Sequence, residues 1–497
     1  MKFKNLISVV VVIILTVDFI SCTNLVSKET DSIVKNSQVG FTAGNPEALL
    51  SSAYKDLAPY QYHGNVFALG EVPTAELVCP TRGVDWSDNG VWRELEQHTW
   101  SPTQRFVINV WNILNGYVYK LTVILASNPT PAQKAEAQFL RAFHMFRVMD
   151  FYGQVPYREV TQGINDLPKV MTRSEAFDYI VKDLTEALPN LRTEGPGTAP
   201  KNGFANKAAA NFLLAKLYLN KAVYKAANSA GPYTFDKADM EKVISCADAI
   251  TSDGYSLDPD YFSAFSNKSR FETIFVSTEG TPQNQWFMSM HFNQNPAGYN
   301  GFTTLASFYD KFEDGDIRKG RPGKRDGTLY SGAGVGFMIG QQYDDNGKPL
   351  VDTRTLKPLV FTREVPLFGA TTTQGIRVLK YHRANYGQYM FMRYGEVALM
   401  KAEAQFRGAD AASAMATLND LRAVRKESLL TSLSSDELFD EIGRETYWEG
   451  CKRTVEVRFG KFTSGEGVTN KAGYTVLYPI PAVAIVANPN LKQNPGY

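Results

Sequence analysis

Cysteine and histidine are scarce in this chain of 497 residues, which contains four cysteines and five histidines. Cys79, Cys246 and Cys451 lie far apart, and their spacing fits neither a zinc site nor a disulfide framework. The five histidines are likewise isolated from one another: His63, His98, His144, His291 and His382. This scarcity argues against a metal centre, and we expect buried free thiols, with one disulfide as the alternative.

The chain also lacks an excess of charge of either sign. It contains 52 lysines and arginines against 51 aspartates and glutamates, a net charge of +1. Nucleic-acid affinity comes mainly from neutralising phosphates with clustered basic residues. A nearly neutral chain with both signs interspersed therefore gives no reason to expect a nucleic-acid partner.

A run of about 20 apolar residues, which a membrane-spanning helix requires, is missing as well. The longest apolar run, residues 6–17, follows Lys2 and Lys4 near the N-terminus. A basic start followed by a short apolar run is typical of an export signal. The sequence therefore predicts that residues 1–21 are a signal peptide and not part of the fold.

The end of this segment indicates lipidation. Ser21 precedes Cys22, and a small residue before a cysteine is what the lipoprotein signal peptidase recognises. An ordinary secretory signal with an incidental cysteine is the alternative. We expect Cys22 to carry acyl chains, which anchor a protein stably when more than one is present, and residues 22–40 to form a flexible tether.

Motifs of the common hydrolases are absent too. The chain contains no Gly-x-Ser-x-Gly elbow and no glycine-rich phosphate loop. A glycosidase would need two carboxylates facing each other across a sugar bond, and no motif singles out such a pair. We therefore expect a binding protein rather than an enzyme.

What the chain does contain is a series of paired helical patterns. Thr130 and Gln133 form a capping box before one helix, Thr172 and Glu175 before another, and Ser434 and Glu437 before a third. The predicted pairs join residues 46–57 with 105–126, the helix after Thr130 with that after Thr172, residues 205–220 with 236–250, and two helices after residue 391. Helical periodicity is lost between about 254 and 390, where residues 271–278 read as a strand.

Eight motifs in a fixed order resemble the SusD/RagB family of surface glycan-binding lipoproteins. They are PTRGVDWSDNGVWRELEQHTW, AQFLRAFHMFRVMDFYGQVPY, ANKAAANFLLAKLYLN, YDKFEDGDIRKG, RYGEVALMKAEA, LNDLRAVR, RETYWEG and NPNLKQNPGY. The resemblance implies a mostly α fold with four tetratricopeptide-like helical pairs. One domain would span 41–497, with a scaffold from 41–253 and 391–497 and a loop-rich insertion, carrying short strands, between them.

The chain departs from the family pattern near its C-terminus. Cys451 and Lys452 stand where the family commonly has histidine and arginine, and Val455 and Glu456 replace a frequent Asp-Leu pair. We expect these positions to stabilise the C-terminal helix rather than to contact a ligand.

Sugars are bound by stacking on aromatic rings and by hydrogen bonds from planar polar side chains. Two segments supply both, and they contain the predicted ligand-binding residues: Arg82, Asp85, Trp86, Asp88, Asn89, Trp286 and Tyr299. Several alternatives remain open at this point. Arg82 and Asp85 could form an internal salt bridge, Trp92 and Trp100 read as core, and the acids before Gly90 could hold a structural cation.

The resemblance implies that the protein captures oligosaccharides and delivers them to a SusC-like TonB-dependent transporter. It would be anchored by its lipid to the outer membrane and face the cell surface. Two alternatives are a peptide-binding import lipoprotein of the same family and a structural docking subunit of the transporter without a ligand site. The sequence implies no cofactor.

Overall fold

The computed structural model describes residues 43–162, 166–197, 201–266, 268–279, 287–325, 332–382 and 388–497. The expected signal peptide, the lipidated Cys22 and the tether lie outside these residues. No helix in the described part of the chain is long and apolar enough to cross a membrane.

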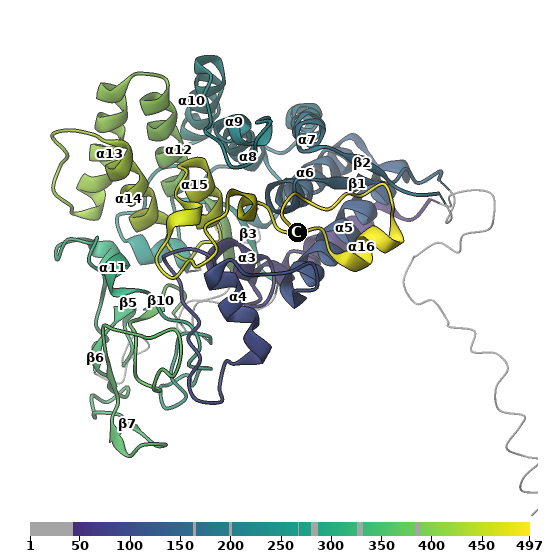
Figure 1. The fold of residues 1–497 in the computed structure, drawn as a ribbon. Helices are drawn as coiled ribbons and strands as arrows, with labels where there is room; N and C mark the ends of the chain where they lie inside the picture. Colours follow the sequence, from purple (N-terminus) through teal and green to yellow (C-terminus); the bar gives the residue numbers. More distant parts are fainter. Residues whose placement is uncertain are drawn as a thin grey trace, which may run out of the picture.

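Helices packed in pairs make up most of the fold (Figure 1). The four pairs are α2 (Pro46–Lys55) with α5 (Arg105–Ala126), α6 (Pro131–Tyr152) with α7 (Arg173–Ala187), α8 (Lys207–Leu219) with α10 (Lys237–Ser252), and α12 (Tyr394–Arg407) with α13 (Ala411–Arg425). Successive pairs also touch, because α5 packs on α6, α7 on α8 and α10 on α12. The predicted helical pairs are therefore confirmed.

Shorter helices connect and flank these pairs. They are α3 (Val66–Glu71), α4 (Val91–Gln97), α9 (Lys221–Tyr224), α11 (Ala306–Tyr309), α14 (Ser435–Thr446), α15 (Lys452–Arg458) and α16 (Ala482–Ala487). Eight 3-10 turns join them: η1 (Ala58–Gln61), η2 (Asp88–Gly90), η3 (Leu188–Asn190), η4 (Lys201–Gly203), η5 (Tyr261–Phe265), η6 (Ile317–Lys319), η7 (Phe462–Ser464) and η8 (Gly473–Val476).

Short antiparallel strands form the remainder, most of them in the predicted loop-rich region. The pairs are β1 (Val155–Tyr157) with β2 (Lys169–Met171), β3 (Thr273–Ser277) with β11 (Tyr389–Arg393), β6 (Gly340–Gln341) with β9 (Val360–Phe361) and β7 (Val351–Asp352) with β8 (Lys357–Pro358). A three-stranded sheet has the order β10 (Arg377–Leu379), β5 (Val335–Met338), β4 (Gly320–Arg321). Strand β3 confirms the strand predicted over 271–278, and Figure 1 shows β5, β6, β7 and β10 together below the helices.

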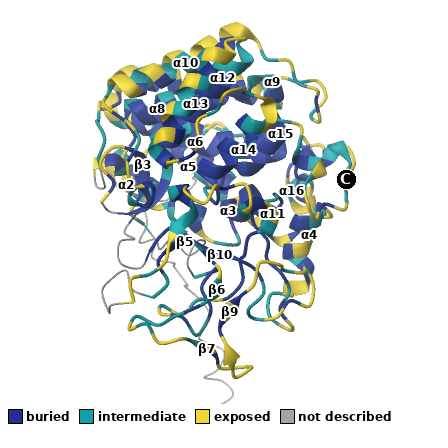
Figure 2. Ribbon diagram, turned by 90° about the vertical axis from the view of Figure 1, so that its left-hand side faces the viewer, coloured by how far each residue is buried: buried dark blue, intermediate teal, exposed yellow. Residues whose placement is uncertain are grey.

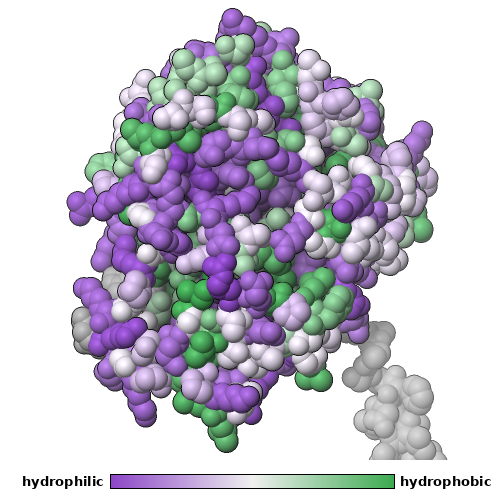
Figure 3. Space-filling model, turned by 60° about the vertical axis from the view of Figure 1, so that its left-hand side comes forward, coloured by the Kyte–Doolittle hydropathy of each residue, from purple (hydrophilic) through white to green (hydrophobic). Residues whose placement is uncertain are grey.

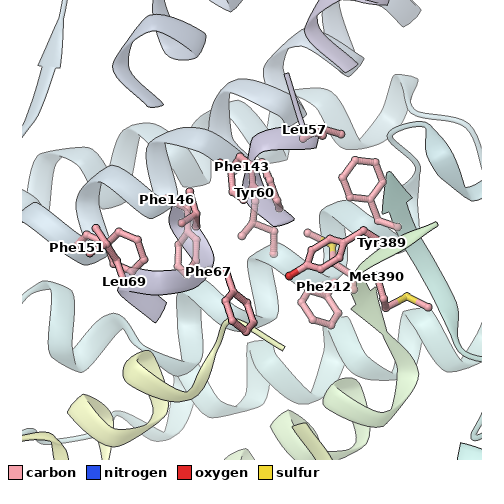
Figure 4. Packing of buried hydrophobic residues seen from close by; sticks show 14 of the residues in the cluster. Leu57, Tyr60, Phe67, Leu69, Phe143, Phe146, Phe151, Phe212, Tyr389 and Met390 are labelled. Carbon is pink, nitrogen blue, oxygen red and sulfur yellow. The ribbon is translucent and has the colours of Figure 1, made fainter. Parts of the chain in front are cut away.

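Helix α6 lies at the centre of the core. Thr130 and Gln133 form the predicted capping box at its start, and Gly153 ends it with a φ of +73°, which costs glycine little. Its apolar face carries Phe143, Phe146 and neighbouring rings that point toward α3, η1, α8 and β11 (Figure 4). Figure 2 shows that α6 and α14 are mostly buried, whereas the outer helix α10 is exposed on one side.

The most specific motifs of the sequence form a buried ion-pair network. Arg318, from the DIRKG segment, has no exposed side-chain surface. Its guanidinium contacts Asp316 at 2.9 Å, Glu441 at 2.7 Å and Glu445 at 3.1 Å, and it also contacts Glu427. Glu427, Glu441 and Glu445 lie more than 100 residues further along the chain, so the network joins the loop-rich region to α14.

The same network continues through the start of α12 and the end of α13. Arg393 contacts Glu272 at 2.9 Å and Glu445 at 2.7 Å, and Arg425 contacts both at 2.8 Å. Burial alone would raise the pKa of the Glu445 carboxyl, but Arg425 and Arg393 outweigh that effect and hold the pKa well below its usual value. Arg318, Arg393, Arg425 and Glu445 therefore serve the fold and do not reach the surface.

The positions where the chain departs from the family pattern are also interior. Cys451, Lys452, Val455 and Glu456 are all buried. The ammonium of Lys452 lies 2.7 Å from Glu76, and burial raises the pKa of Glu456 to about 8. These contacts agree with the expectation that this segment packs α15 and does not contact a ligand.

Candidate ligand-binding surface

The segment from Arg82 to Gly90 folds as a tight loop that projects side chains outward. Backbone hydrogen bonds run both ways between Arg82 and Asp85, at 2.9 and 3.0 Å. Val84, at the tip, is 90% exposed. Beyond the tip the backbone enters the left-handed region, with φ of +63° at Trp86 and +55° at Asn89. Such values are uncommon for residues other than glycine and cluster at functional sites.

The side chain of Trp86 is half-buried and lies against the loop that follows strand β3 in the sequence. Its indole Nε1 donates to the carbonyl oxygen of Tyr299 at 3.0 Å. A Cβ atom at Gly301 would come within 2.9 Å of two indole carbons, so the absence of a side chain there makes room for the ring. The loop around Gly301 is itself held by backbone bonds from Gly301 and Phe302 to the carbonyl of Met288, at 2.7 and 2.8 Å.

Two further aromatic residues lie in the segment whose backbone holds the indole. Tyr299 is 53% exposed, and its ring centroid lies 5.7 Å from that of the half-buried Phe287, with the planes tilted by 32°. We call Trp86, Phe287 and Tyr299 the aromatic platform. The sequence predicted Trp86 and Tyr299 as ligand contacts, and the structure brings these two together. Trp286 lies outside the described residues.

The surroundings of the aromatic platform carry little net charge. Asp85 pairs with Arg354 at 2.5 Å, and the Arg354 guanidinium lies 4.3 Å from the centroid of the Phe292 ring. His63, whose ring is 6.5 Å from that of Trp86, has its pKa lowered by burial and is therefore neutral at neutral pH. The platform thus suits an uncharged ligand with apolar faces and hydroxyl groups.

The other predicted site residues lie elsewhere. Arg82 is 4% exposed, and its guanidinium donates to the carbonyl oxygens of Thr371 and Gln374. It thus supports the loop from beneath and forms no ion pair with Asp85. Asp88 accepts the indole N–H of the buried Trp92 at 2.7 Å, and Asn89 is exposed at the edge of the loop.

Sequence reasoning missed three contributors to this surface: Phe287, Phe292 and Arg354. Phe287 and Phe292 lie in the same segment as Trp286 and Tyr299, so aromatic density there was the available signal. No feature of the sequence pointed to Arg354, because only the fold brings it to Asp85. Among the described residues no group of three or more side chains is arranged to hold a metal ion.

The comparisons with known proteins bear on both fold and site. A family model described as "Starch-binding associating with outer membrane" matches residues 29–219. The starch-binding protein SusD of Bacteroides thetaiotaomicron is 26% identical, over 88% of this chain and 86% of its own length.

Solved structures of the family share the fold. A SusD superfamily protein from Parabacteroides distasonis superposes with a TM-score of 0.69 at 19% identity, covering 91% of this chain and 98% of its own. Surface glycan-binding protein A from B. thetaiotaomicron, solved with laminarihexaose, gives a TM-score of 0.65 at 18% identity, with 90% and 98% covered. The chain is therefore similar to SusD-like proteins over most of its length and shares their fold, and the relatives that these comparisons name are binding proteins.

Proposed function

We propose that this protein captures oligosaccharides at the aromatic platform and delivers them to a SusC-like TonB-dependent transporter of the outer membrane. The observation that carries the proposal is the exposed Tyr299, whose backbone carbonyl accepts the indole N–H of Trp86, next to the Asp85–Arg354 ion pair. Aromatic rings present an apolar face to the C–H groups of a sugar, and adjacent polar groups meet its hydroxyls.

Two relatives support the ligand class. One is named for binding starch, and the other was solved with laminarihexaose. Both ligands are neutral glucans, in keeping with the low net charge around the platform. Figure 3 shows one face of the molecule, on which hydrophobic residues occur in separate patches among hydrophilic ones, as expected for a surface that contacts hydroxyl-rich ligands.

The proposal also covers the remaining parts of the chain. Residues 1–21 act as the signal peptide, Cys22 carries the lipid, and residues 22–40 tether one domain spanning 41–497 to the outer membrane. The lipid holds the platform at the cell surface, where weak contacts raise the local concentration of glycan above the transporter. Energy-coupled transport belongs to the transporter and not to this chain.

The test is binding to a panel of polysaccharides, including starch and laminarin, by wild type, Trp86→Ala and Tyr299→Ala. We expect each variant to lose about tenfold or more in affinity for the glycan that wild type binds, which corresponds to about 1.4 kcal/mol. Tyr119→Ala is the matched control, because Tyr119 is 44% exposed on α5, away from the platform. Affinity electrophoresis and calorimetry would measure the change.

Other outcomes decide between the alternatives. If both platform variants bind like wild type, the site assignment is wrong. If wild type binds none of the polysaccharides but binds a mixed peptide digest, the protein is a peptide-import lipoprotein. If it binds neither ligand but still assembles with the transporter, it is a docking subunit.

A further inference from the structure

A cleft lies among the helices of the described part of the molecule. It has a volume of about 470 Å³ and is bounded by α2, α6, η4 and the end of β3. Figure 2 shows α2 beside β3 at one edge of the helical scaffold, whereas the short strands β6 and β7 lie at the other end. None of its lining residues belongs to the platform. A volume of this size is in the range of small-molecule sites.

The cleft has an aromatic wall. The rings of Tyr54 and Phe204 meet edge to face, with centroids 5.1 Å apart and planes at 78°. Phe204 is 37% exposed, and the guanidinium of Arg192 lies 4.9 Å from the centroid of its ring. A large apolar ring left this exposed inside a concave site is available to a ligand face.

Polar groups beside the rings are held in fixed positions. The Glu136 carboxylate accepts the hydroxyl of Tyr54, and it accepts Arg192 Nη2 at 3.0 Å. The Tyr54 oxygen in turn accepts the backbone N–H of Ala205 at 3.0 Å. Arg192 keeps 41% of its side chain exposed, and its other N–H groups are placed to donate to hydroxyl oxygens.

The charge of the lining selects against ionic ligands. Its acids are Glu47, Glu136 and Glu279, and its bases are Lys55 and Arg192. Since Arg192 and Glu136 pair with each other, Glu47, Glu279 and Lys55 leave the lining with one net negative charge. A phosphate, sulfate or uronic acid would require a basic excess, so the lining fits a neutral, hydroxyl-rich ligand.

We propose that this cleft is a second carbohydrate-binding site, specific for a short stretch of a neutral oligosaccharide that stacks on Phe204. The ligand class rests on the proposed function, because we take the ligand of the cleft to be the same glycan that the platform captures. The protein then holds two glycan segments at once, one at the platform and one between α2, α6 and η4.

The test first removes two aromatic side chains of the platform by mutation. In a Trp86→Ala/Tyr299→Ala double variant, maltohexaose and laminarihexaose are added separately and followed by saturation-transfer difference NMR. We expect one of the two hexaoses to retain a signal. Ser51→Trp, which adds a bulky side chain to the exposed α2 position lining the cleft, then reduces that signal at least fivefold.

Two further variants provide a second change in the cleft and a matched control. Phe204→Ala removes the proposed stacking ring and should reduce the signal to a similar extent, while Ser245→Trp on the exposed side of α10 is the matched control and should leave it unchanged. Thermal melting of each variant shows whether it is folded.

The two proposals fail in different ways. No signal from either hexaose in the double variant, or a signal that Ser51→Trp and Phe204→Ala leave intact, overturns the second site while the platform stands. If instead the double variant binds as tightly as wild type and Ser51→Trp abolishes that binding, the cleft is the principal site and the platform assignment falls.

Discussion

At the scale of single residues, the position of Trp86 depends on a neighbour that has no side chain. The indole lies against Gly301, and one added methyl group would come within 2.9 Å of it. The ring is otherwise fixed by its hydrogen bond to the Tyr299 carbonyl. We therefore expect glycan binding at the proposed site to depend on Gly301, although this residue only makes room for the indole.

Gly301→Ala tests this dependence. Overpacking of a fitted site costs ~1–3 kcal/mol, so we expect the indole to shift and the affinity for glycan to fall about tenfold, although no aromatic residue is removed. Calorimetry with the glycan bound by wild type measures the loss. The control is Gly116→Ala, since nothing lies within 4 Å of a Cβ at that exposed position of α5. Equal affinity of wild type and Gly301→Ala would show that the ring position is not critical.

The sequence indicated the loop positions of Trp86 and Tyr299 but not the burial of Arg82, for a physical reason. Trp86 and Tyr299 were identified because aromatic residues next to glycine and polar residues indicate exposed loops. Arg82 lies in the same loop and has the same apparent chemistry, yet it is buried under Thr371 and Gln374, almost 300 residues away. The direction of a loop side chain depends on contacts that local sequence does not record.

At the scale of elements, the helix pairs were predictable because their signals are local. Caps, apolar spacing of 3.6 residues and terminal glycines all lie within the segment they define. The bounds of α6 and α7 follow from Thr130 and Thr172, whose capping boxes are both present in the structure. The short strands lack such signals, because two-residue strands are set by their partners, and only β3 was identified in advance.

Thr130→Ala should weaken the scaffold measurably at α6. Loss of an N-cap side chain costs about 1 kcal/mol in the free energy of unfolding. Here the backbone N–H of Gln133 would lose its acceptor, the hydroxyl oxygen of Thr130. Urea denaturation measures the difference. Thr185→Ala, at an exposed interior position of α7, is the control and should change stability by only a few tenths of a kcal/mol. A loss of the same size in the control would contradict the capping explanation.

At the scale of the whole molecule, the buried ion-pair network joins segments that are far apart in the sequence. Its arginines and Glu445 come from the motifs that carried the resemblance, whereas Glu272, Glu427 and Glu441 lie outside them, and at the sequence level all these charges look like ordinary polar residues. The structure shows them sealed in the interior, where Arg393 and Arg425 share Glu272 and Glu445. Pairings across more than 100 residues are not visible in one sequence.

Arg393→Met should therefore be severely destabilising. Removing one partner of a buried ion pair leaves uncompensated carboxylates and costs about 3–5 kcal/mol in the free energy of unfolding. The matched control is Arg321→Met, because Arg321 pairs with Asp260 at the surface, with half of each side chain exposed, and such pairs contribute less than about 1 kcal/mol. Chemical denaturation of both variants measures the contrast, and losses of similar size would argue against the network's structural role.

The shielding of the three described cysteines has a practical consequence. Cys79 and Cys451 are buried and Cys246 is half-buried, and burial raises the pKa of Cys246 to about 11 and that of Cys451 to about 12. These thiols stay protonated and react slowly with alkylating reagents. A fluorophore attached through Val84→Cys, at the tip of the loop before Trp86, would then label one site next to the platform and report glycan capture on living cells in real time.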